Sequence, residues 1–151
     1  MKRVLLAGII LILLGLLQSI SYHPPLPNQY VDTEYGRIAY KTYGEGEKIL
    51  IAIHGSPGSK NDFDRLGPLL TNYTVYALDM PGFGESTKRA KDYGFSQASE
   101  VLLSFMDIQG IDKAEILGYS WGGGVASTFA STHPERTTQL IMLAGVGVPE
   151  A

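Results

Sequence analysis

Cysteine is absent from the 151 residues, and tryptophan occurs once. No disulfide, thiolate metal site or lipid-modified N-terminal cysteine can form in such a chain. Net charge is also small, at −3, and the chain has neither a basic patch nor an acidic tract, so nucleic acid is not a predicted partner. The three histidines are scattered, and therefore no metal or organic cofactor is predicted.

The longest apolar run stands at the start of the chain. Lys2 and Arg3 precede an apolar stretch over residues 4–17. One interpretation is a secretory signal cleaved after the small-x-small sequence of residues 19–21. The other is an uncleaved anchor, because a helix over residues 4–20 would be about 25 Å long, near the lower limit for a bilayer. We favour the anchor because the cleavage site is weak; in both cases the basic end stays cytoplasmic and the rest is exported.

Three segments follow from this pattern. Residues 1–21 are the signal anchor or signal peptide, and residues 22–28, with three prolines, form a stiff spacer. Residues 29–151 form a single domain, since hydrophobic residues make up 44% of the chain and its length allows one core.

Strand and helix patterns alternate along this domain. The alternation around Gly36 predicts an antiparallel hairpin over residues 30–43. Further strands are predicted at 48–53, 73–78, 114–117 and 140–144, and helices at 61–70, 96–108 and 121–132. Ser59 is the predicted cap of the first helix. The predicted fold class is therefore α/β, a mostly parallel, doubly wound sheet with helices on both faces.

The inward positions of two helices are predicted from their spacing. Those of the first are Phe63, Leu66, Leu69 and Leu70, and those of the second are Ala98, Val101, Leu102, Phe105 and Ile108.

Ser120 lies in a G-x-S-x-G sequence between an apolar strand and a helix of small residues. This context is typical of a nucleophile elbow, in which the serine is held at the tip of a sharp strand-to-helix turn. Gly118 and Gly122 leave room for the tight backbone crossing. Ser120 is the predicted nucleophile toward an acyl carbon, and the backbone N–H of Trp121 is a predicted oxyanion-hole donor.

Two other motifs follow predicted strands. His54-Gly55-Ser56-Pro57-Gly58 follows the strand at 48–53, and the D-x-P-G-x-G-x-S sequence of residues 79–86 follows the strand at 73–78. With the serine motif, in this order, they resemble the α/β-hydrolase fold family over roughly residues 29–144. The resemblance implies that ligand binds at the carboxyl ends of the strands.

Roles for the first motif loop are implied by this resemblance. Ser56 would supply the second oxyanion-hole N–H through its backbone, and His54 would be structural, packed beneath the loop. Gly55, Pro57 and Gly58 would shape the same loop.

The remaining candidates are interpreted from the sequence in the same way. Asp79 is interpreted as an anchor of its own loop rather than a catalytic acid, with Gly82 beside it. His133 would lie at the surface end of a helix, and Tyr76 and Tyr119 are expected in the core.

The resemblance also implies an acid and then a histidine after the nucleophile. His133 is the only later histidine and is poorly placed, and Glu150 is a weak candidate for the acid. We therefore expect residues 29–151 to be the N-terminal part of such a domain, without its lid and C-terminal strands. Such a fragment lacks the catalytic acid and base and has little activity alone.

The predicted function is hydrolysis of a small-molecule carboxylic ester or related acyl substrate, with the membrane as a partner through the N-terminal helix. Alternatives are a membrane-anchored binding module of the same fold without activity, one chain of a split hydrolase, and a peptidase that releases N-terminal residues. The sequence leaves the oligomeric state open.

Overall fold

The computed structural model describes residues 26–89, 92 and 94–145. The predicted anchor or signal over residues 1–21, most of the spacer and Glu150 lie outside these residues. No helix within the described ranges is long and apolar enough to cross a membrane.

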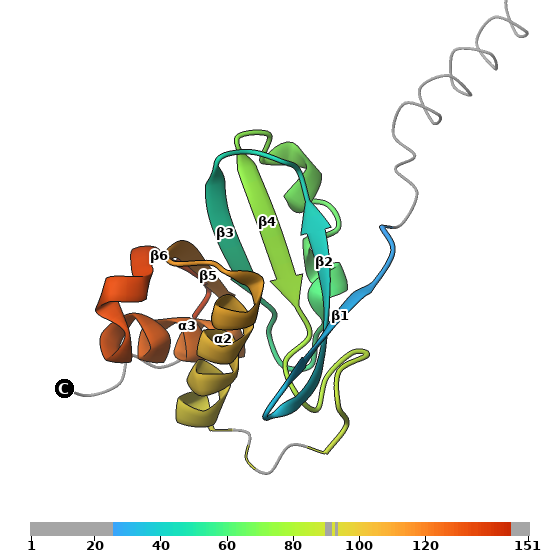
Figure 1. Ribbon diagram of the computed structural model, residues 1–151, viewed down its shortest axis with the longest axis vertical. Coiled ribbons are helices and arrows are strands. Elements are labelled where there is room, and N and C mark those ends of the chain that lie inside the picture. Colours follow the sequence, from blue (N-terminus) through green and yellow to red (C-terminus); the bar gives the residue numbers. More distant parts are fainter. Residues whose placement is uncertain (1–25, 90–91, 93, 146–151) are drawn as a thin grey trace, which may run out of the picture.

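A six-stranded sheet forms the centre of the domain, in the order β1-β2-β4-β3-β5-β6 (Figure 1). The hairpin of β1 (Gln29–Thr33) and β2 (Gly36–Tyr43) is antiparallel, and β2 pairs antiparallel with β4 (Tyr73–Leu78). The strands β4, β3 (Lys48–Ile53), β5 (Ala114–Tyr119) and β6 (Thr137–Leu143) are mutually parallel. The predicted α/β class with a mostly parallel sheet is confirmed, and the predicted hairpin is also present.

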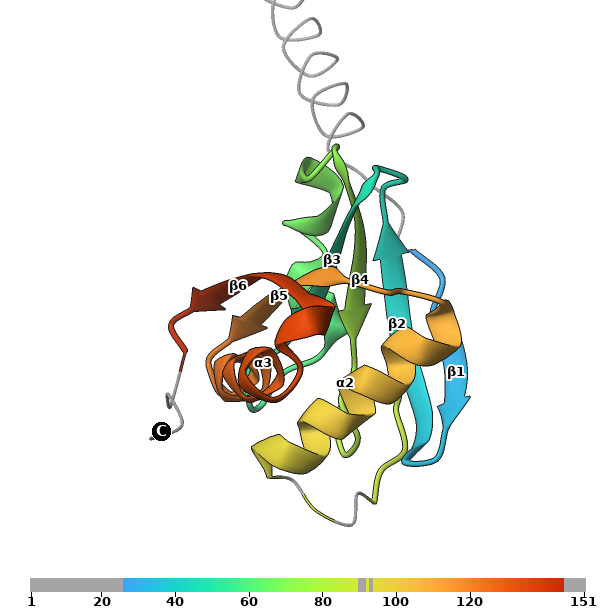
Figure 2. The ribbon, with the colours of Figure 1, turned by 60° about the vertical axis from the view of Figure 1, so that its left-hand side comes forward.

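The α-helices of the described chain, α2 (Phe95–Gln109) and α3 (Trp121–Thr132), lie together on one face of the sheet (Figure 2). Their apolar side chains pack against β2, β3, β4 and β5 in the larger core cluster. The helix α2 ends at Gly110, whose left-handed backbone, φ 67°, lets its N–H close the last turn. Ile108 was expected inward but is 50% exposed; Met106, four residues after Leu102, takes the inward position instead.

The opposite face carries two short 3-10 turns, η1 (Lys60–Phe63) and η2 (Gly67–Leu69), in place of the predicted helix over 61–70. Pro68 explains the difference, because it has no N–H for a helical hydrogen bond and its ring collides with the preceding turn. Leu69 was predicted to point inward but is 74% exposed. Ser59 does cap η1, accepting a hydrogen bond from the N–H of Asn61 at 3.3 Å.

β6 begins three residues earlier than predicted, and within the described residues it pairs only with β5. Three of its large apolar side chains are exposed: Leu140, Met142 and Leu143. Within residues 26–145, the described part of the sheet, β6 is therefore an edge strand with exposed apolar side chains.

Candidate active site

Ser120 lies between the end of β5 and the first residue of α3. Its backbone has φ 50° and ψ −115°, a conformation that residues with a side chain rarely adopt. The N–H of Ser120 donates to the carbonyl of Leu143 at 2.9 Å, and its own carbonyl accepts the N–H of Gly123 at 2.8 Å. The unusual backbone is thus held by the neighbouring strand and by the helix.

Gly118 and Gly122 make the tight crossing possible. A Cβ on Gly118 would lie 2.2 Å from the carbonyl oxygen of Gly122. A Cβ on Gly122 would lie 2.4 Å from the carbonyl oxygen of Ile53 at the end of β3. Only glycine therefore fits at either position, and α3 can begin directly beside the end of β3.

The loop after β3 lies against this turn. A Cβ on Gly55 would lie 3.1 Å from the Cβ of Ser120, so the two backbones are close. Ser56 and Pro57 are exposed, while Gly58 is partly buried. Among the described residues, the N–H of Ser56 has no acceptor, and the N–H of Trp121, in the first turn of α3, has no partner within the helix.

His54 is fully buried at the base of this loop. Its Nδ1 is 2.6 Å from the carbonyl oxygen of Gly55, which can only accept, and its Nε2 accepts the N–H of Met80 at 3.2 Å. The ring is therefore neutral with the proton on Nδ1. Burial lowers its pKa, and with both nitrogens engaged it has no position free to act as a base.

Asp79 and Gly82 lie in the loop after β4. The Asp79 carboxylate is fully buried and accepts hydrogen bonds from the Nζ and backbone N–H of Lys60 and from the N–H of Glu85. Burial alone would raise its pKa, but these donors outweigh burial and hold the pKa below the usual range. The N–H of Gly82 donates to Thr87 at 2.7 Å, which closes the same loop.

Aromatic rings pack around the first residue of α3. The indole of Trp121 stacks with the His54 ring at 6.3 Å between centroids and contacts Phe83 at 5.4 Å and Phe95 at 6.1 Å. Phe83 also meets the edge of the His54 ring at 4.9 Å. These rings form a rigid apolar layer beneath the loop and the elbow.

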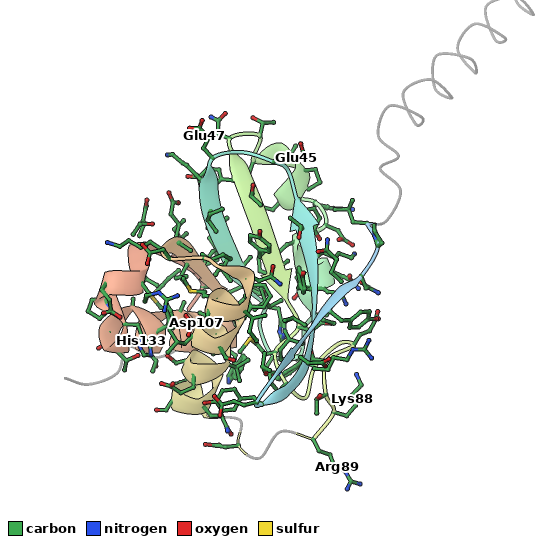
Figure 3. The ribbon with its side chains drawn as sticks, in the orientation of Figure 1. Glu45, Glu47, Lys88, Arg89, Asp107 and His133 are labelled. Atoms are coloured by element: carbon green, nitrogen blue, oxygen red, sulfur yellow. The ribbon has the colours of Figure 1, made fainter. Side chains whose placement is uncertain are left out.

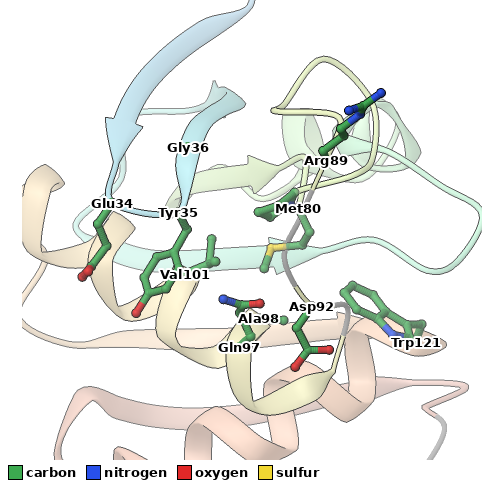
Figure 4. Close-up of a pocket in the computed structure, with 11 residues that line it drawn as sticks. Glu34, Tyr35, Gly36, Met80, Arg89, Asp92, Gln97, Ala98, Val101 and Trp121 are labelled. Atoms are coloured by element: carbon green, nitrogen blue, oxygen red, sulfur yellow. The ribbon is translucent and has the colours of Figure 1, made fainter.

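A pocket of about 310 Å³ has Trp121 as part of its lining (Figure 4). The turn of the β1–β2 hairpin, the start of α2 and the loop after β4 surround it. Its apolar lining includes Met80, Ala98, Val101 and Trp121, and its charged rim includes Glu34, Arg89 and Asp92. Ser120 is not in the lining, so the pocket neighbours the serine through Trp121 rather than containing it.

Comparisons with known proteins agree with this geometry. A sequence model described as alpha/beta hydrolase fold matches residues 48–150. The chain belongs to the alpha/beta hydrolase fold family.

Individual relatives within this family are hydrolases and related enzymes. The chain is 36% identical over 124 residues, 82% of its length, to a dihydrolipoyllysine-residue acetyltransferase component of an acetoin cleaving system from Cupriavidus necator. It is 41% identical over 110 residues, 70% of its length, to a 2-hydroxymuconate semialdehyde hydrolase from Pseudomonas putida. A crystal structure of a membrane phospholipase A, described as a bacterial virulence factor, matches all of this chain with a TM-score of 0.77 and 30% identity. The chain spans 33%, 38% and 54% of the lengths of these three proteins.

The described part of this alpha/beta hydrolase chain brings no general base to Ser120. No imidazole or carboxylate in it hydrogen-bonds the serine hydroxyl. His133 follows the last residue of α3 (Figure 3), and because that helix has 12 residues its two ends are about 18 Å apart. Its ring packs on Phe129 and lies 3.4 Å from a carboxylate oxygen of Glu100.

Two residues of the site region were placed wrongly or missed by sequence reasoning. Tyr119 was expected in the core but is 44% exposed; it is the last residue of β5 and pairs with exposed Leu143 of the edge strand β6. Lys60 was not singled out, yet it is buried against Asp79. No local pattern marks it, since its partner lies 19 residues further along the chain. Tyr76 is partly buried against Tyr40 and Phe105, near its predicted place.

Proposed function

We propose that this chain carries the nucleophile and oxyanion hole of a serine hydrolase that acts on a carboxylic ester. One observation supports the proposal most: the backbone of Ser120, with φ 50° and ψ −115°, at the turn from β5 into α3. Such strain persists only where surrounding structure enforces it, and it is concentrated at functional sites. It presents the hydroxyl at the positive end of the helix.

In the proposed reaction, the Ser120 hydroxyl attacks the acyl carbon and the carbonyl oxygen becomes an oxyanion. The N–H groups of Ser56 and Trp121 would stabilise that charge, as preorganised donors do in acyl transfer. The base that takes the serine proton and the acid that orients it would come from outside the described residues, since His54 and Asp79 are both fully engaged.

Lipid esters are the substrate class that we favour. The likeness to a membrane phospholipase A extends over the whole chain, and the sequence begins with a basic pair followed by an apolar run. The proposed location is therefore a membrane-anchored enzyme with its globular domain exported. A pocket of about 310 Å³ with an apolar lining suits a short acyl chain or one end of a longer one.

A second candidate follows from the relatives with the most similar sequences. Several of them are hydrolases of unsaturated oxo acids by name, including 2-hydroxymuconate semialdehyde hydrolase at 41% identity. The proposed nucleophile and oxyanion hole would be the same, and the charged pocket rim, with Arg89, would receive a carboxylate.

The experiment compares the hydrolysis of different substrates by the whole protein that the gene encodes. Acyl p-nitrophenyl esters, phosphatidylcholine vesicles and 2-hydroxymuconate semialdehyde are each tested with wild type, Ser120→Ala and the control Ser131→Ala. Ser131 is an exposed serine near the opposite end of α3. The expected result is ester hydrolysis that Ser120→Ala abolishes and Ser131→Ala preserves. Turnover of the semialdehyde alone would favour the second candidate. Activity that survives Ser120→Ala, or none with any substrate, would contradict the proposal.

A further inference from the structure

Lys60 is a fully buried lysine, and its position next to the proposed oxyanion loop needs an explanation. Only 1% of its side chain is exposed, and its Nζ lies 2.7 Å from Oδ2 of Asp79. The backbone N–H of the same residue donates to Oδ1 of Asp79 at 2.6 Å. One carboxylate thus holds Lys60 by both its main chain and its side chain.

The Asp79 carboxylate is itself fixed from the other side. Its Oδ2 accepts the N–H of Glu85 at 2.7 Å, and the Asp79 carbonyl accepts the hydroxyl of Ser86 at 2.6 Å. Gly84 packs so closely that a Cβ there would lie 2.0 Å from Oδ2, and its φ of +46° is also one that favours glycine. The carboxylate therefore cannot follow Lys60 if the lysine moves.

Both ends of the loop over residues 54–60 are held by consecutive residues of the β4 loop. His54, at the start, accepts the N–H of Met80, and Lys60, at the end, is held by Asp79. Ser56 lies between these two fixed points and is itself exposed. The position of its N–H relative to Ser120 thus depends on the two attachments.

Burying an ammonium and a carboxylate is expensive, and an apolar pair of similar volume is often as stable or more stable. A requirement for stability alone therefore gives no reason for this pair. The pair joins the end of the proposed oxyanion loop, residues 54–60, to the start of the loop after β4, and this attachment gives a reason other than stability.

We propose that Lys60 is a positioning residue that, through Asp79, holds the Ser56 N–H in place for the oxyanion formed at Ser120. The role rests on the proposed serine hydrolase function. It assigns to a buried lysine a contribution to the rate of the chemical step without contact with substrate.

A second carboxylate, that of Glu85, lies near the Lys60 ammonium and is itself held by hydrogen bonds. Glu85 Oε1 lies 3.6 Å from the Lys60 Nζ and is half exposed. Asn28 and Tyr30, at the start of the domain, each donate to the Glu85 carboxylate at 2.6–2.9 Å. The Lys60 ammonium therefore lies between two carboxylates, those of Asp79 and Glu85.

The test compares two Lys60 variants with a matched control, in the protein expressed from its own gene and with the ester substrate. Lys60→Met removes the ammonium but leaves the Asp79 carboxylate buried without it. Lys60→Met/Asp79→Asn also removes that unpaired charge, so this variant keeps the test valid if the first fails to fold. The control is Lys41→Met, because Lys41, on β2, is another buried lysine and lies 2.7 Å from the carboxylate of Asp64, and neither residue belongs to the loop over residues 54–60.

The expected result for both Lys60 variants is a kcat about ten- to a hundredfold lower, as for a displaced oxyanion donor, with KM within about twofold of wild type. The melting temperature should recover in the double variant, while kcat should not. Lys41→Met should lower the melting temperature and leave kcat unchanged.

Three contrary outcomes are distinguishable. A Ser120-dependent activity with wild-type kcat in folded Lys60 variants would overturn the positioning role alone. So would a kcat that returns with the melting temperature in the double variant. Activity that does not depend on Ser120 would overturn both the positioning role and the proposed function.

Discussion

At the scale of single residues, the site region uses histidine and aspartate as structural groups. His54 begins the loop beside the elbow and Asp79 holds the end of that loop, and hydrogen bonds to the backbone occupy both side chains. A histidine beside a candidate serine would ordinarily be taken for a base. Its two nitrogens, one donating to Gly55 and one accepting from Met80, exclude that role and make it part of the framework.

The buried His54 ring predicts a pH-dependent stability. Burial lowers its pKa below the ordinary value of 6.5, so the unfolded chain takes up a proton near pH 6.5 while the folded chain does not. The contribution of the neutral His54 ring to the stability of the fold is therefore complete above pH 6.5 and is lost progressively as the pH falls. Melting temperatures measured between pH 7.5 and about pH 5 should decrease with acidity in the wild type.

The variant that tests this pH dependence is His54→Gln. Loss of buried hydrogen bonds should cost about 1–3 kcal/mol at pH 7.5, and the melting temperature should depend less on pH in the same range. Gly110→Ala serves as control, because it strains the backbone at φ 67° without removing a titrating group, and its pH dependence should match wild type. If the melting temperature of His54→Gln depends on pH as strongly as that of the wild type, the pH dependence does not come from the His54 ring.

At the scale of helices and strands, the sequence predicts most of this domain for a simple reason. Buried parallel strands are continuous apolar runs, so the boundaries of β3 and β4 could be read directly, and α3 ends before Pro134 as predicted. The turns η1 and η2 were missed because apolar spacing was given more weight than Pro68.

The site was predictable to the extent that it consists of local motifs. The strand-to-helix turn at Ser120 and the loop at His54 each follow from a few adjacent residues. The burial of Lys60 could not be predicted, because Asp79 comes beside it only when β3 and β4 pair in parallel.

The elbow glycines give the prediction for this scale. Gly122→Ala would place a Cβ 2.4 Å from the Ile53 carbonyl, so α3 must move away from β3 and carry Ser120 with it. We expect ester hydrolysis to fall at least about a hundredfold, since small misplacements at a reacting centre have effects of that size. Gly110→Ala, which meets no atom within 4 Å, should keep its activity. Steady-state kinetics of ester hydrolysis with both variants tests this prediction. Equal activities of Gly122→Ala and Gly110→Ala would refute the argument from the close packing of Gly122.

At the scale of the whole molecule, the two edges of the sheet differ. The β1 edge is short, and the hydrogen bonds of Asn28 and Tyr30 with Glu85 tie its start to the loop after β4. The β6 edge has no partner strand among the described residues and exposes apolar side chains. Unpaired apolar edges favour association with other chains.

This edge predicts the behaviour of the chain without its apolar start. A polypeptide of residues 26–151 should self-associate in sedimentation velocity, and Leu140→Lys should shift it toward the monomer, because a charge on an edge strand opposes pairing. Leu69→Lys is the control: it replaces a more exposed leucine on η2, away from the edge, and should leave association unchanged. A monomeric wild type would contradict the prediction.

The most direct test of the account is covalent labelling of Ser120. The protein expressed from its own gene is treated with a fluorophosphonate, digested and analysed by mass spectrometry. The account predicts one phosphonylated serine, Ser120, with labelling lost in Ser120→Ala and retained in Ser131→Ala. Labelling at a different serine, or none in a folded protein that hydrolyses ester, would contradict the assignment of Ser120 as the nucleophile.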